Sequence, residues 1–281
     1  MFRLDEAARH KLYKSFGKTE QTVNEDIKLV KKWMQTQLHL PEIMEDAKIR
    51  NFLQLNKFDI DKTKEKIDSY YTIRAKIPDL FREGNPKLAN IQAVLDTTYC
   101  STHPAPYNGT HRVIFLKHKE PNVFAPSDLA KLALAIFEIR LFEDCMIDDI
   151  IVFDLSNLTL RDMLKVSPKF IIRAFSVYKN VFSLRLKTLY FVNSPFYVSG
   201  WMTLLKFLVK PKLFDRVQVH RDGEVVKELF SNDELPKDYG GDGPTLEDLN
   251  GMIKEKLLQY QDRFDKMDTL KVDETLRPKK R

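Results

Sequence analysis

The chain has 281 residues, of which 43% are hydrophobic and 31% charged, and this composition excludes both an intrinsically disordered protein and a short disulfide-stapled one. Its two cysteines make no disulfide framework and no apolar run reaches the roughly 17–25 residues that span a bilayer, so we expect one or two soluble domains in a reducing cytosol. A formal net charge of +6 is compatible with an anionic membrane or a nucleic acid as a partner, but it requires neither.

Residues 1–100 show helical periodicity throughout. The tetrad Thr-Val-Asn-Glu at 22–25 has the spacing of a capping box and predicts a helix that starts there. Apolar residues then recur on one face of that helix, at Ile27, Val30, Met34 and Leu38. Two more helices are expected, around 49–53 and over 60–74. We therefore predict a helical N-terminal domain over 1–100 and a turn-rich linker over 101–110.

Beyond the linker, short apolar runs alternate with helical segments. The runs typical of buried strands lie at 113–116, 150–153, 188–192 and 217–220. The helical segments between them lie at 127–141 and 167–178. Strands that alternate with helices predict an α/β fold with a mostly parallel sheet. We place this second domain at 111–260 and a C-terminal tail at 261–281, which we expect to be loose from Lys271 onward.

The segment 196–209 is apolar around almost its whole helical circumference. Its polar side chains Ser199, Thr203 and Lys206 form one narrow stripe, and about fourteen residues are too few to span a bilayer. One interpretation is a helix buried in the core. The other is a movable lid, with one face on an internal apolar ligand and the other able to enter lipid. Gly200 weakens the helix locally and favours the movable lid.

Recognisable catalytic and cofactor motifs are missing from the sequence, which does not favour an enzyme. The chain lacks the glycine-rich turn of dinucleotide-binding folds, the P-loop and the nucleophile elbow Gly-x-Ser-x-Gly. The acidic pairs at 143–144 and 148–149 are typical of a solvated turn, and Asp154 of a cap or turn after a strand. Four candidate zinc ligands match no zinc spacing, namely Cys100, His103, His111 and His118. We therefore expect no catalytic residue, no metal and no cofactor.

Two groups of cations flank the apolar segment. Arg185 and Lys187 share one face of a predicted strand, and Lys210, Lys212 and Arg216 follow the apolar helix. If the helix folds back over the strand, these charges converge into a phosphate-binding patch; the alternative is a scattered, solvated surface. A nucleic acid matches less well, because exposed aromatic residues are not interleaved with the cations. We therefore expect an anionic membrane as a partner and no nucleic acid.

Several short motifs follow one another in a definite order. They are Phe-Leu at 52–53 with Phe-Asp at 58–59, Tyr-Tyr at 70–71, Phe-Asp-Leu at 153–155, Val-Asn-Ser-Pro-Phe at 192–196, Lys-Pro at 210–211, Val-Gln-Val-His at 217–220 and Leu-Pro-Lys-Asp-Tyr-Gly-Gly at 235–241. In this order and spacing the chain resembles the CRAL-TRIO lipid-binding family, in the group of the alpha-tocopherol transfer and retinaldehyde-binding proteins. It departs from many relatives at 54–56, where Gln-Leu-Asn replaces a segment with two arginines.

The resemblance implies an all-helical N-terminal domain followed by an α/β/α CRAL-TRIO domain, with a mostly parallel sheet as the floor of a pocket and a mobile gate helix above it. The pocket residues that it implies are Phe153, Leu158, Val166, Val177, Tyr178, Phe182, Leu184, Leu189 and Phe191. The gate-helix residues that it implies are Phe196, Trp201, Leu204, Leu205 and Leu208. The phosphoinositide contacts that it implies are Arg185, Lys187, Lys210, Lys212 and Arg216.

Pattern and resemblance together predict a carrier and not an enzyme. We expect a monomeric cytoplasmic protein that binds a small hydrophobic ligand, such as a lipid, an isoprenoid vitamin or a retinoid-like compound. It would exchange this ligand at phosphoinositide-containing membranes, with which it associates transiently. One alternative is a membrane-trafficking adaptor that senses phosphoinositides as a signal. A less favoured alternative is an α/β enzyme with an unrecognised site.

Overall fold

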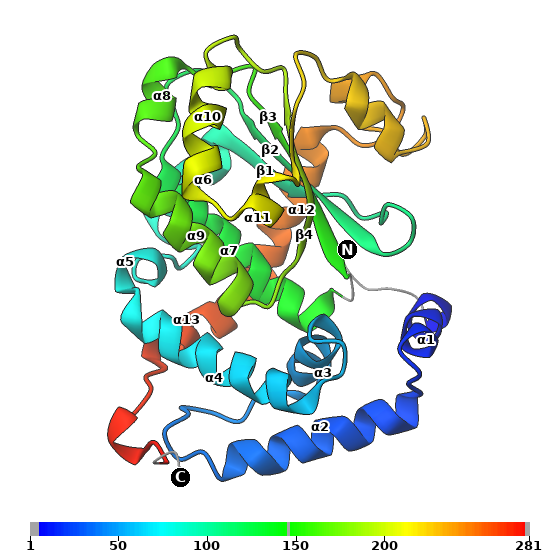
Figure 1. Ribbon diagram of the computed structural model, residues 1–281, viewed down its shortest axis with the longest axis vertical. Coiled ribbons are helices and arrows are strands. Elements are labelled where there is room, and N and C mark those ends of the chain that lie inside the picture. Colours follow the sequence, from blue (N-terminus) through cyan, green and yellow to red (C-terminus); the bar gives the residue numbers. More distant parts are fainter. Residues whose placement is uncertain (1–5, 145–146, 279–281) are drawn as a thin grey trace.

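The computed structural model describes residues 6–144 and 147–278, in which a helical part precedes an α/β part (Figure 1). The helices that precede the sheet are α1 Glu6–Ser15, α2 Glu20–Gln35, α3 Asp46–Leu55, α4 Ile60–Lys76, α5 Pro78–Phe81 and α6 Ala89–Thr97. The all-helical start of the chain is therefore confirmed.

Helix α2 begins one turn earlier than predicted. The Thr19 side chain accepts a hydrogen bond from the Thr22 backbone nitrogen at 3.2 Å, and Thr22 Oγ1 accepts one from the Thr19 nitrogen at 2.9 Å. This reciprocal pair is a capping box with a threonine in place of the usual glutamate. The capping box predicted at 22–25 is wrong, because Thr22 is already the third residue of the helix.

The described strands form one five-stranded sheet in the order β1-β2-β3-β4-β5. They are β1 Thr98–Thr102, β2 His111–His118, β3 Asp148–Asp154, β4 Leu186–Val192 and β5 Val217–Val219. The edge strand β1 is antiparallel to β2, and the other neighbours are parallel. The α/β fold with a mostly parallel sheet is therefore confirmed.

Helices cover both faces of this sheet (Figure 1). One face carries α7 Pro126–Glu143, α9 Pro168–Asn180, α10 Val198–Leu208 and the short α11 Pro211–Phe214, with α8 Leu160–Leu164 beside α10. The other face carries the segment Glu224–Leu229 and α12 Leu246–Gln259, which is followed by α13 Gln261–Thr269. Successive side chains of β3 point to opposite faces of the sheet. Ile150 and Val152 pack toward α12, and Ile151 faces the α9 side.

Strand β1 extends into the segment predicted as a linker. Residues 98–102 pair with residues 118–114 of β2, so the first two residues of the expected linker at 101–110 belong to the sheet. Tyr99 and Cys100 pack into the hydrophobic clusters on opposite faces of this edge strand. The turn-forming residue types of this stretch predicted a linker. The strand was missed because the residues that bury it lie far away in the sequence.

The part of the segment 261–281 that the structure describes, up to residue 278, packs against the rest of the protein and is not a loose tail. Helix α13 buries Arg263 and Phe264. Further on, the Asp273 nitrogen donates a hydrogen bond to the His39 carbonyl oxygen, and Arg277 Nη1 lies 2.6 Å from Asp68 Oδ2 on α4. The expectation of loose chain from Lys271 is therefore wrong up to residue 278.

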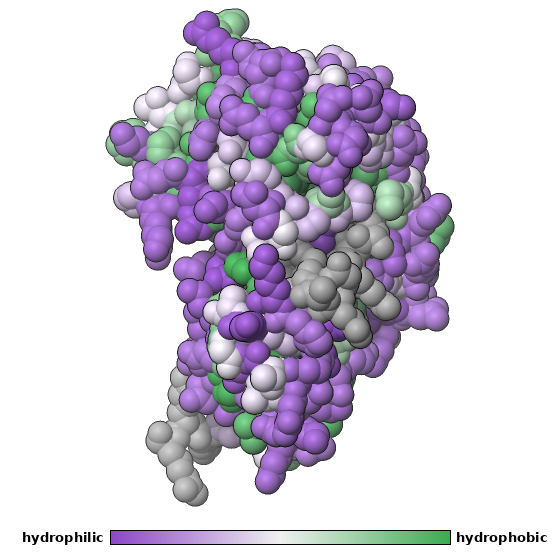
Figure 2. Space-filling model, turned by 90° about the vertical axis from the view of Figure 1, so that its right-hand side faces the viewer, coloured by the Kyte–Doolittle hydropathy of each residue, from purple (hydrophilic) through white to green (hydrophobic). Residues whose placement is uncertain are grey.

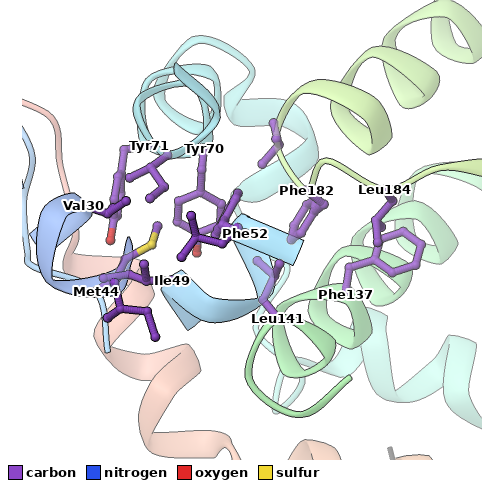
Figure 3. Close-up of a cluster of buried hydrophobic side chains, with 14 of the residues drawn as sticks. Val30, Met44, Ile49, Phe52, Tyr70, Tyr71, Phe137, Leu141, Phe182 and Leu184 are labelled. Atoms are coloured by element: carbon purple, nitrogen blue, oxygen red, sulfur yellow. The ribbon is translucent and has the colours of Figure 1, made fainter. Parts of the chain in front are cut away.

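A hydrophobic cluster joins the helical part to the α/β part. In Figure 3, Phe52 of α3 and Tyr70 of α4 lie on one side of this cluster, and Phe137 of α7 and Phe182 lie on the other. The Tyr70 and Phe182 rings meet edge to face, with 6.1 Å between their centroids. Continuous burial of this kind stabilises the two parts as one packed unit.

A buried polar network crosses the same junction. Lys48 Nζ of α3 lies 2.6 Å from Glu138 Oε1 of α7, and the Tyr70 hydroxyl donates to Glu138 Oε2 at 2.6 Å. Arg263 of α13 reaches the same carboxylate at 3.1 Å and also pairs with Glu42 at 2.8 Å. Burial alone would raise the pKa of Glu138, but the charges of Lys48, Arg74 and Arg263 outweigh it and lower this pKa to about 2.

Candidate functional site

A cavity of about 290 Å³ lies between the sheet and the helices α7, α9, α10 and α11. No charged side chain lines it among the described residues. Its floor is formed by apolar residues of the sheet, including Ile151, Leu189 and Phe191. The facing helices present small residues, namely Ala130 and Ala133 on α7 and Ala174 on α9. These alanines leave open a space that larger side chains would fill.

The implied pocket residues divide into two groups. Val177, Tyr178, Leu189 and Phe191 line the cavity. The others pack elsewhere in the core, with Phe153, Leu158 and Val166 in the cluster around Met163 and with Phe182 and Leu184 in the cluster shared with the N-terminal helices (Figure 3). Sequence reasoning did not find the lining residues on α7, because their alternation of alanine and large apolar residues is also typical of an ordinary core helix.

Helix α10 covers one side of the cavity. Trp201 and Leu205 line the cavity, and Val198 is buried one turn before them. The opposite side of the segment is exposed to solvent, with Phe196 88% and Phe207 82% exposed and Leu204 also exposed. The side chain of Leu208 is outside the part that the structure describes. Because large apolar residues face outward, the interpretation as a fully buried core helix does not describe this segment.

The neighbouring helices α8, α9 and α10 carry several exposed apolar residues. Figure 2 shows another side of the molecule, the right-hand side of Figure 1, which is largely hydrophilic with scattered apolar residues. The exposed apolar residues are Leu160 and Leu164 of α8, Ile172 of α9, Leu204 and Phe207 of α10, and Phe196 just before α10. These three helices are neighbours, since the Tyr197 hydroxyl donates to the Leu158 carbonyl oxygen next to α8 and α9 contacts α10. Adjacent exposed apolar residues of this kind are typical of interaction surfaces.

A second, basic pocket of about 560 Å³ opens next to the cavity. Its cationic lining residues are Lys57, Lys62, Arg185, Lys187, Lys212 and Arg216. Asp148 is the only acidic residue among the described lining residues, and its Oδ1 lies 3.5 Å from Arg185 Nε. The pocket therefore carries a large excess of positive charge, which suits an anion with several negative charges.

The structure brings four of the five implied phosphoinositide residues together. Arg185, Lys187, Lys212 and Arg216 line the basic pocket, whereas Lys210 is exposed outside it. Lys57 and Lys62 were missed by the sequence reasoning. They follow the segment 54–56, where arginines are absent, and supply cations from the N-terminal helices. The turn that carries Lys57 has a left-handed backbone, with φ of 59°.

The cavity and the basic pocket share one wall. Leu186 at the start of β4 lines both spaces, and its neighbours Arg185 and Lys187 line the basic pocket. After α10 the same division recurs, because Lys212 faces the basic pocket while Leu213 and Phe214 line the cavity. Residues 185–187 therefore alternate between the cationic space and the apolar one, and residues 212–214 place one cation and two apolar side chains on the same two spaces.

The acidic pairs near this wall are not a solvated turn, as was expected. Asp144 and Asp149 are buried, with Asp144 paired to Arg112 at 3.0 Å and Asp149 to Arg140 at 2.5 Å. Burial favours the neutral form of Asp144, but the charges of Arg140 and Arg112 lower its pKa below the ordinary value. The buried side chains of Arg112 and Arg140 require acidic partners. Their pairing with Asp144 and Asp149 cannot be read from the sequence spacing.

The remaining candidate groups have structural roles. Asp154 Oδ1 accepts hydrogen bonds from the Ser156 nitrogen and from Asn193 Nδ2, each at 3.0 Å, so its predicted turn role is confirmed. Within residues 6–144 and 147–278, no group of three or more histidine, cysteine or acidic side chains is placed to hold a metal ion. In the same part of the chain, no helix combines the length and apolarity needed to cross a bilayer.

Two family models match the chain. A Pinta-like UBA domain matches residues 19–91, and the CRAL/TRIO domain matches residues 107–241. The first match covers α2 to α5 and the start of α6. The second covers β2 to β5 together with α7 to α11, and leaves out the edge strand β1. Residues 107–241 therefore form a CRAL/TRIO domain, in agreement with the prediction from the motifs.

Individual relatives agree with this assignment. The alpha-tocopherol transfer protein-like protein of Homo sapiens is 24% identical over 220 residues, which are 74% of this chain and 62% of that protein. The chain thus spans less than two thirds of that relative. Clavesin-2 of Rattus norvegicus is 23% identical over 235 residues, which are 78% of this chain and 69% of that protein. The crystal structure of Sfh5 shares the fold with a TM-score of 0.51, at 14% identity and with 93% of this chain and 99% of that chain covered.

Proposed function

We propose that this protein is an intracellular carrier that holds a small hydrophobic ligand in the cavity under α10 and exchanges it at phosphoinositide-containing membranes. The observation that carries the proposal is the shared wall between the apolar cavity and the basic pocket. An anionic headgroup in the basic pocket brings the gate helix and the cavity next to the bilayer. Cargo binding and membrane docking then use opposite sides of the same short segments.

The outward side of the gate region suits a bilayer surface. Phe196 and Phe207 are large apolar residues in solvent, and insertion into the boundary between headgroups and acyl chains removes them from water. Cations of the basic pocket add roughly 1 kcal/mol each near an anionic leaflet. Such docking is reversible, because it depends on a few side chains and a few charges rather than on a spanning helix.

The CRAL/TRIO domain at residues 107–241 supports a lipid-like ligand. One relative is named for its likeness to the alpha-tocopherol transfer protein, and we therefore propose ligand transfer between membranes as the activity. We do not propose tocopherol as the ligand, because relatives that are only 24% identical can bind different ligands. We further propose a monomer that is cytoplasmic and associates with membranes transiently.

Filling the cavity should abolish cargo binding. In Ala133→Phe, a ring replaces a methyl group on the α7 wall, and we expect the affinity for a neutral apolar fluorescent probe to fall at least tenfold. The control is Ala93→Phe on the exposed side of α6, which makes the same chemical change outside the cavity. Titration of both variants with the probe, after a thermal melt shows that both are folded, checks the prediction. Equal probe affinities of Ala133→Phe and Ala93→Phe would contradict ligand binding in this cavity.

Removing one outward ring should weaken membrane association. In Phe207→Ser, the loss of about 2 kcal/mol of apolar burial predicts roughly 30-fold weaker binding to vesicles of phosphatidylcholine and phosphatidylinositol bisphosphate. Leu258→Ser on α12 is the control, because Leu258 is 72% exposed on a helix that covers the other face of the sheet. Vesicle co-flotation measures both variants. A loss that is equal for Leu258→Ser would contradict the assignment of α10 to the membrane side.

Two measurements separate a carrier from an adaptor. A carrier accelerates the transfer of a fluorescent lipid from donor to acceptor vesicles, and mass spectrometry of the protein purified from its native source finds a bound hydrophobic molecule. An adaptor is recruited to phosphoinositide vesicles without accelerating transfer. Recruitment alone, with no transfer and no copurified ligand, would therefore overturn the carrier.

A further inference from the structure

The cavity is apolar but for a few hydrogen-bonding groups. Four of its lining residues carry one, namely Cys100, Thr102, Tyr178 and Trp201. The Tyr178 hydroxyl is engaged, since it donates to Asp149 Oδ2 at 2.7 Å. Burial raises the pKa of the Cys100 thiol to about 12, so this group stays neutral and is a weak donor. Trp201 is half-buried on the gate helix.

Thr102 differs from these groups. Its side chain is fully buried, and its Oγ1 atom has no hydrogen-bond partner in the part of the chain that the structure describes. Threonine hydroxyls in protein interiors are paired as a rule, because an unpaired buried hydroxyl keeps the cost of leaving water without a compensating bond. A hydroxyl that lines a binding cavity obtains its missing partner when a ligand with a polar group enters.

The position of Thr102 in β1 directs this side chain to the cavity. Thr102 is paired with Ile114 of β2, and both residues line the cavity, as does Cys100 two positions earlier. The residue between them, Ser101, faces the other side of the sheet, where its hydroxyl donates to the Leu246 carbonyl oxygen of α12. The period of two along a strand therefore separates a paired hydroxyl on the α12 side from an unpaired one on the cavity side.

We propose that Thr102 Oγ1 is a hydrogen-bonding anchor for the ligand, and that the ligand is an uncharged molecule with one oxygen function, a hydroxyl or a carbonyl, on an apolar body. This inference rests on the proposed carrier function and adds the chemical class of the cargo. A single unpaired hydroxyl matches a single polar group. The threonine hydroxyl can donate to a carbonyl or exchange a hydrogen bond with an alcohol.

The cavity lining also disfavours charged ligands. A carboxylate or a phosphate in this space would lose its hydration, and no cation among the described lining residues would compensate for that loss. Fatty acids and phospholipid headgroups are therefore excluded from the cavity itself. Its volume of about 290 Å³ corresponds to roughly ten groups the size of a water molecule, which suits one short apolar chain or ring system.

The test compares a matched pair of ligands on three forms of the protein. Decan-1-ol and undecane have the same number of non-hydrogen atoms and differ in one hydroxyl. Thr102→Val removes the side-chain hydroxyl at almost constant shape, and Thr102→Ser keeps it. Quenching or enhancement of Trp201 fluorescence, in a Trp33→Phe background, reports binding, because Trp201 lies in the cavity wall.

We expect wild type to prefer decan-1-ol to undecane, beyond the difference that their water solubility creates. Thr102→Val should weaken decan-1-ol binding about tenfold and leave undecane binding unchanged. Thr102→Ser should keep the preference. Without ligand, Thr102→Val should melt at a temperature no lower than wild type, because the unpaired hydroxyl has been removed.

Each other outcome overturns the inference in a distinguishable way. If both ligands bind wild type and Thr102→Val changes neither or changes both equally, the anchor is wrong while the carrier function stands. If the preference persists in Thr102→Val and disappears in Trp201→Phe, for which binding is measured by equilibrium dialysis because this variant lacks the fluorescent reporter, the polar contact belongs to the gate helix. If neither ligand binds wild type, and a screen of larger lipids also finds no binding, the proposed function fails together with the inference.

Discussion

Replacing Glu138 by glutamine is expected to lower the free energy of unfolding by about 3–5 kcal/mol. The substitution keeps the size of the side chain but removes the charge that Lys48 and Arg263 share, at 2.6 Å and 3.1 Å. Both Lys48 and Glu138 are fully buried, so the ammonium group would stay in a poorly solvating interior without its counter-ion. Chemical denaturation of wild type and variant, followed by tryptophan fluorescence and circular dichroism, measures the difference.

Two further variants make this prediction specific. Asp46→Asn breaks the exposed pair with Lys31, and we expect a loss of about 1 kcal/mol or less. Adding Lys48→Met to Glu138→Gln removes the unpaired ammonium and should recover part of the lost stability. A loss below 1 kcal/mol for Glu138→Gln, or no recovery in the double variant, would show that the network does not hold the helical part to the α/β part.

The same network predicts acid sensitivity. The pKa of Glu138 and that of Glu42 are each lowered from 4.5 to about 2, where the charges and hydrogen bonds of Arg263 and its neighbours outweigh burial. A carboxyl group whose folded pKa is depressed stabilises the fold above its unfolded pKa, and this contribution is lost as pH falls through the folded value. Stability should therefore decrease between about pH 4.5 and pH 2, and Glu138→Gln should show a smaller decrease over this window.

Reversing two charges of the basic pocket is expected to weaken binding to phosphoinositide vesicles by about a thousandfold. Lys187→Glu with Lys212→Glu removes two cations and adds two anions, which at roughly 1 kcal/mol each changes the binding free energy by about 4 kcal/mol. Both lysines are exposed, so the fold should tolerate the change. Co-flotation with phosphatidylcholine vesicles that contain a few per cent of phosphatidylinositol bisphosphate, at fixed salt, measures the effect.

The matched control for this pair is Lys28→Glu with Lys32→Glu. These two lysines are exposed on α2 of the helical part, and their reversal changes the net charge by the same amount. We expect the control to lose less than tenfold in vesicle binding, and both variants to keep wild-type affinity for a neutral probe in the cavity. Equal losses in the two variants would mean that net charge, and not the basic pocket, governs docking.

The order of motifs in the sequence sufficed to predict the architecture. Strand and helix positions after residue 110 agree with β2, β3, β4, α7 and α9 to within a few residues, because short buried strands and amphipathic helices leave distinct periods. The segment 196–209 was singled out by its excess of apolar residues, and four of the five cations assigned to phosphate line one pocket. These features depend on local pattern, which a sequence records directly.

Other features depend on contacts between distant residues. The strand β1, the docked C-terminal segment and the buried pairs of Asp144 and Asp149 look like turn, tail and solvated acid in the sequence, because their partners lie far along the chain. Lys57 joins the basic pocket only when the helical part packs beside β4.

The sequence by itself thus determined the α/β architecture, the apolar segment 196–209 and the cations on either side of it, because hydrophobic period and charge are local properties. Only the tertiary structure decided which apolar residues surround a cavity and which fill the core. Phe182 and Leu189 are both apolar, and the sequence does not distinguish them. In the structure Phe182 packs against Tyr70, whereas Leu189 lines the cavity. The difference is made by the residues opposite them, and the alanines of α7 and α9 leave the space that a ligand can occupy.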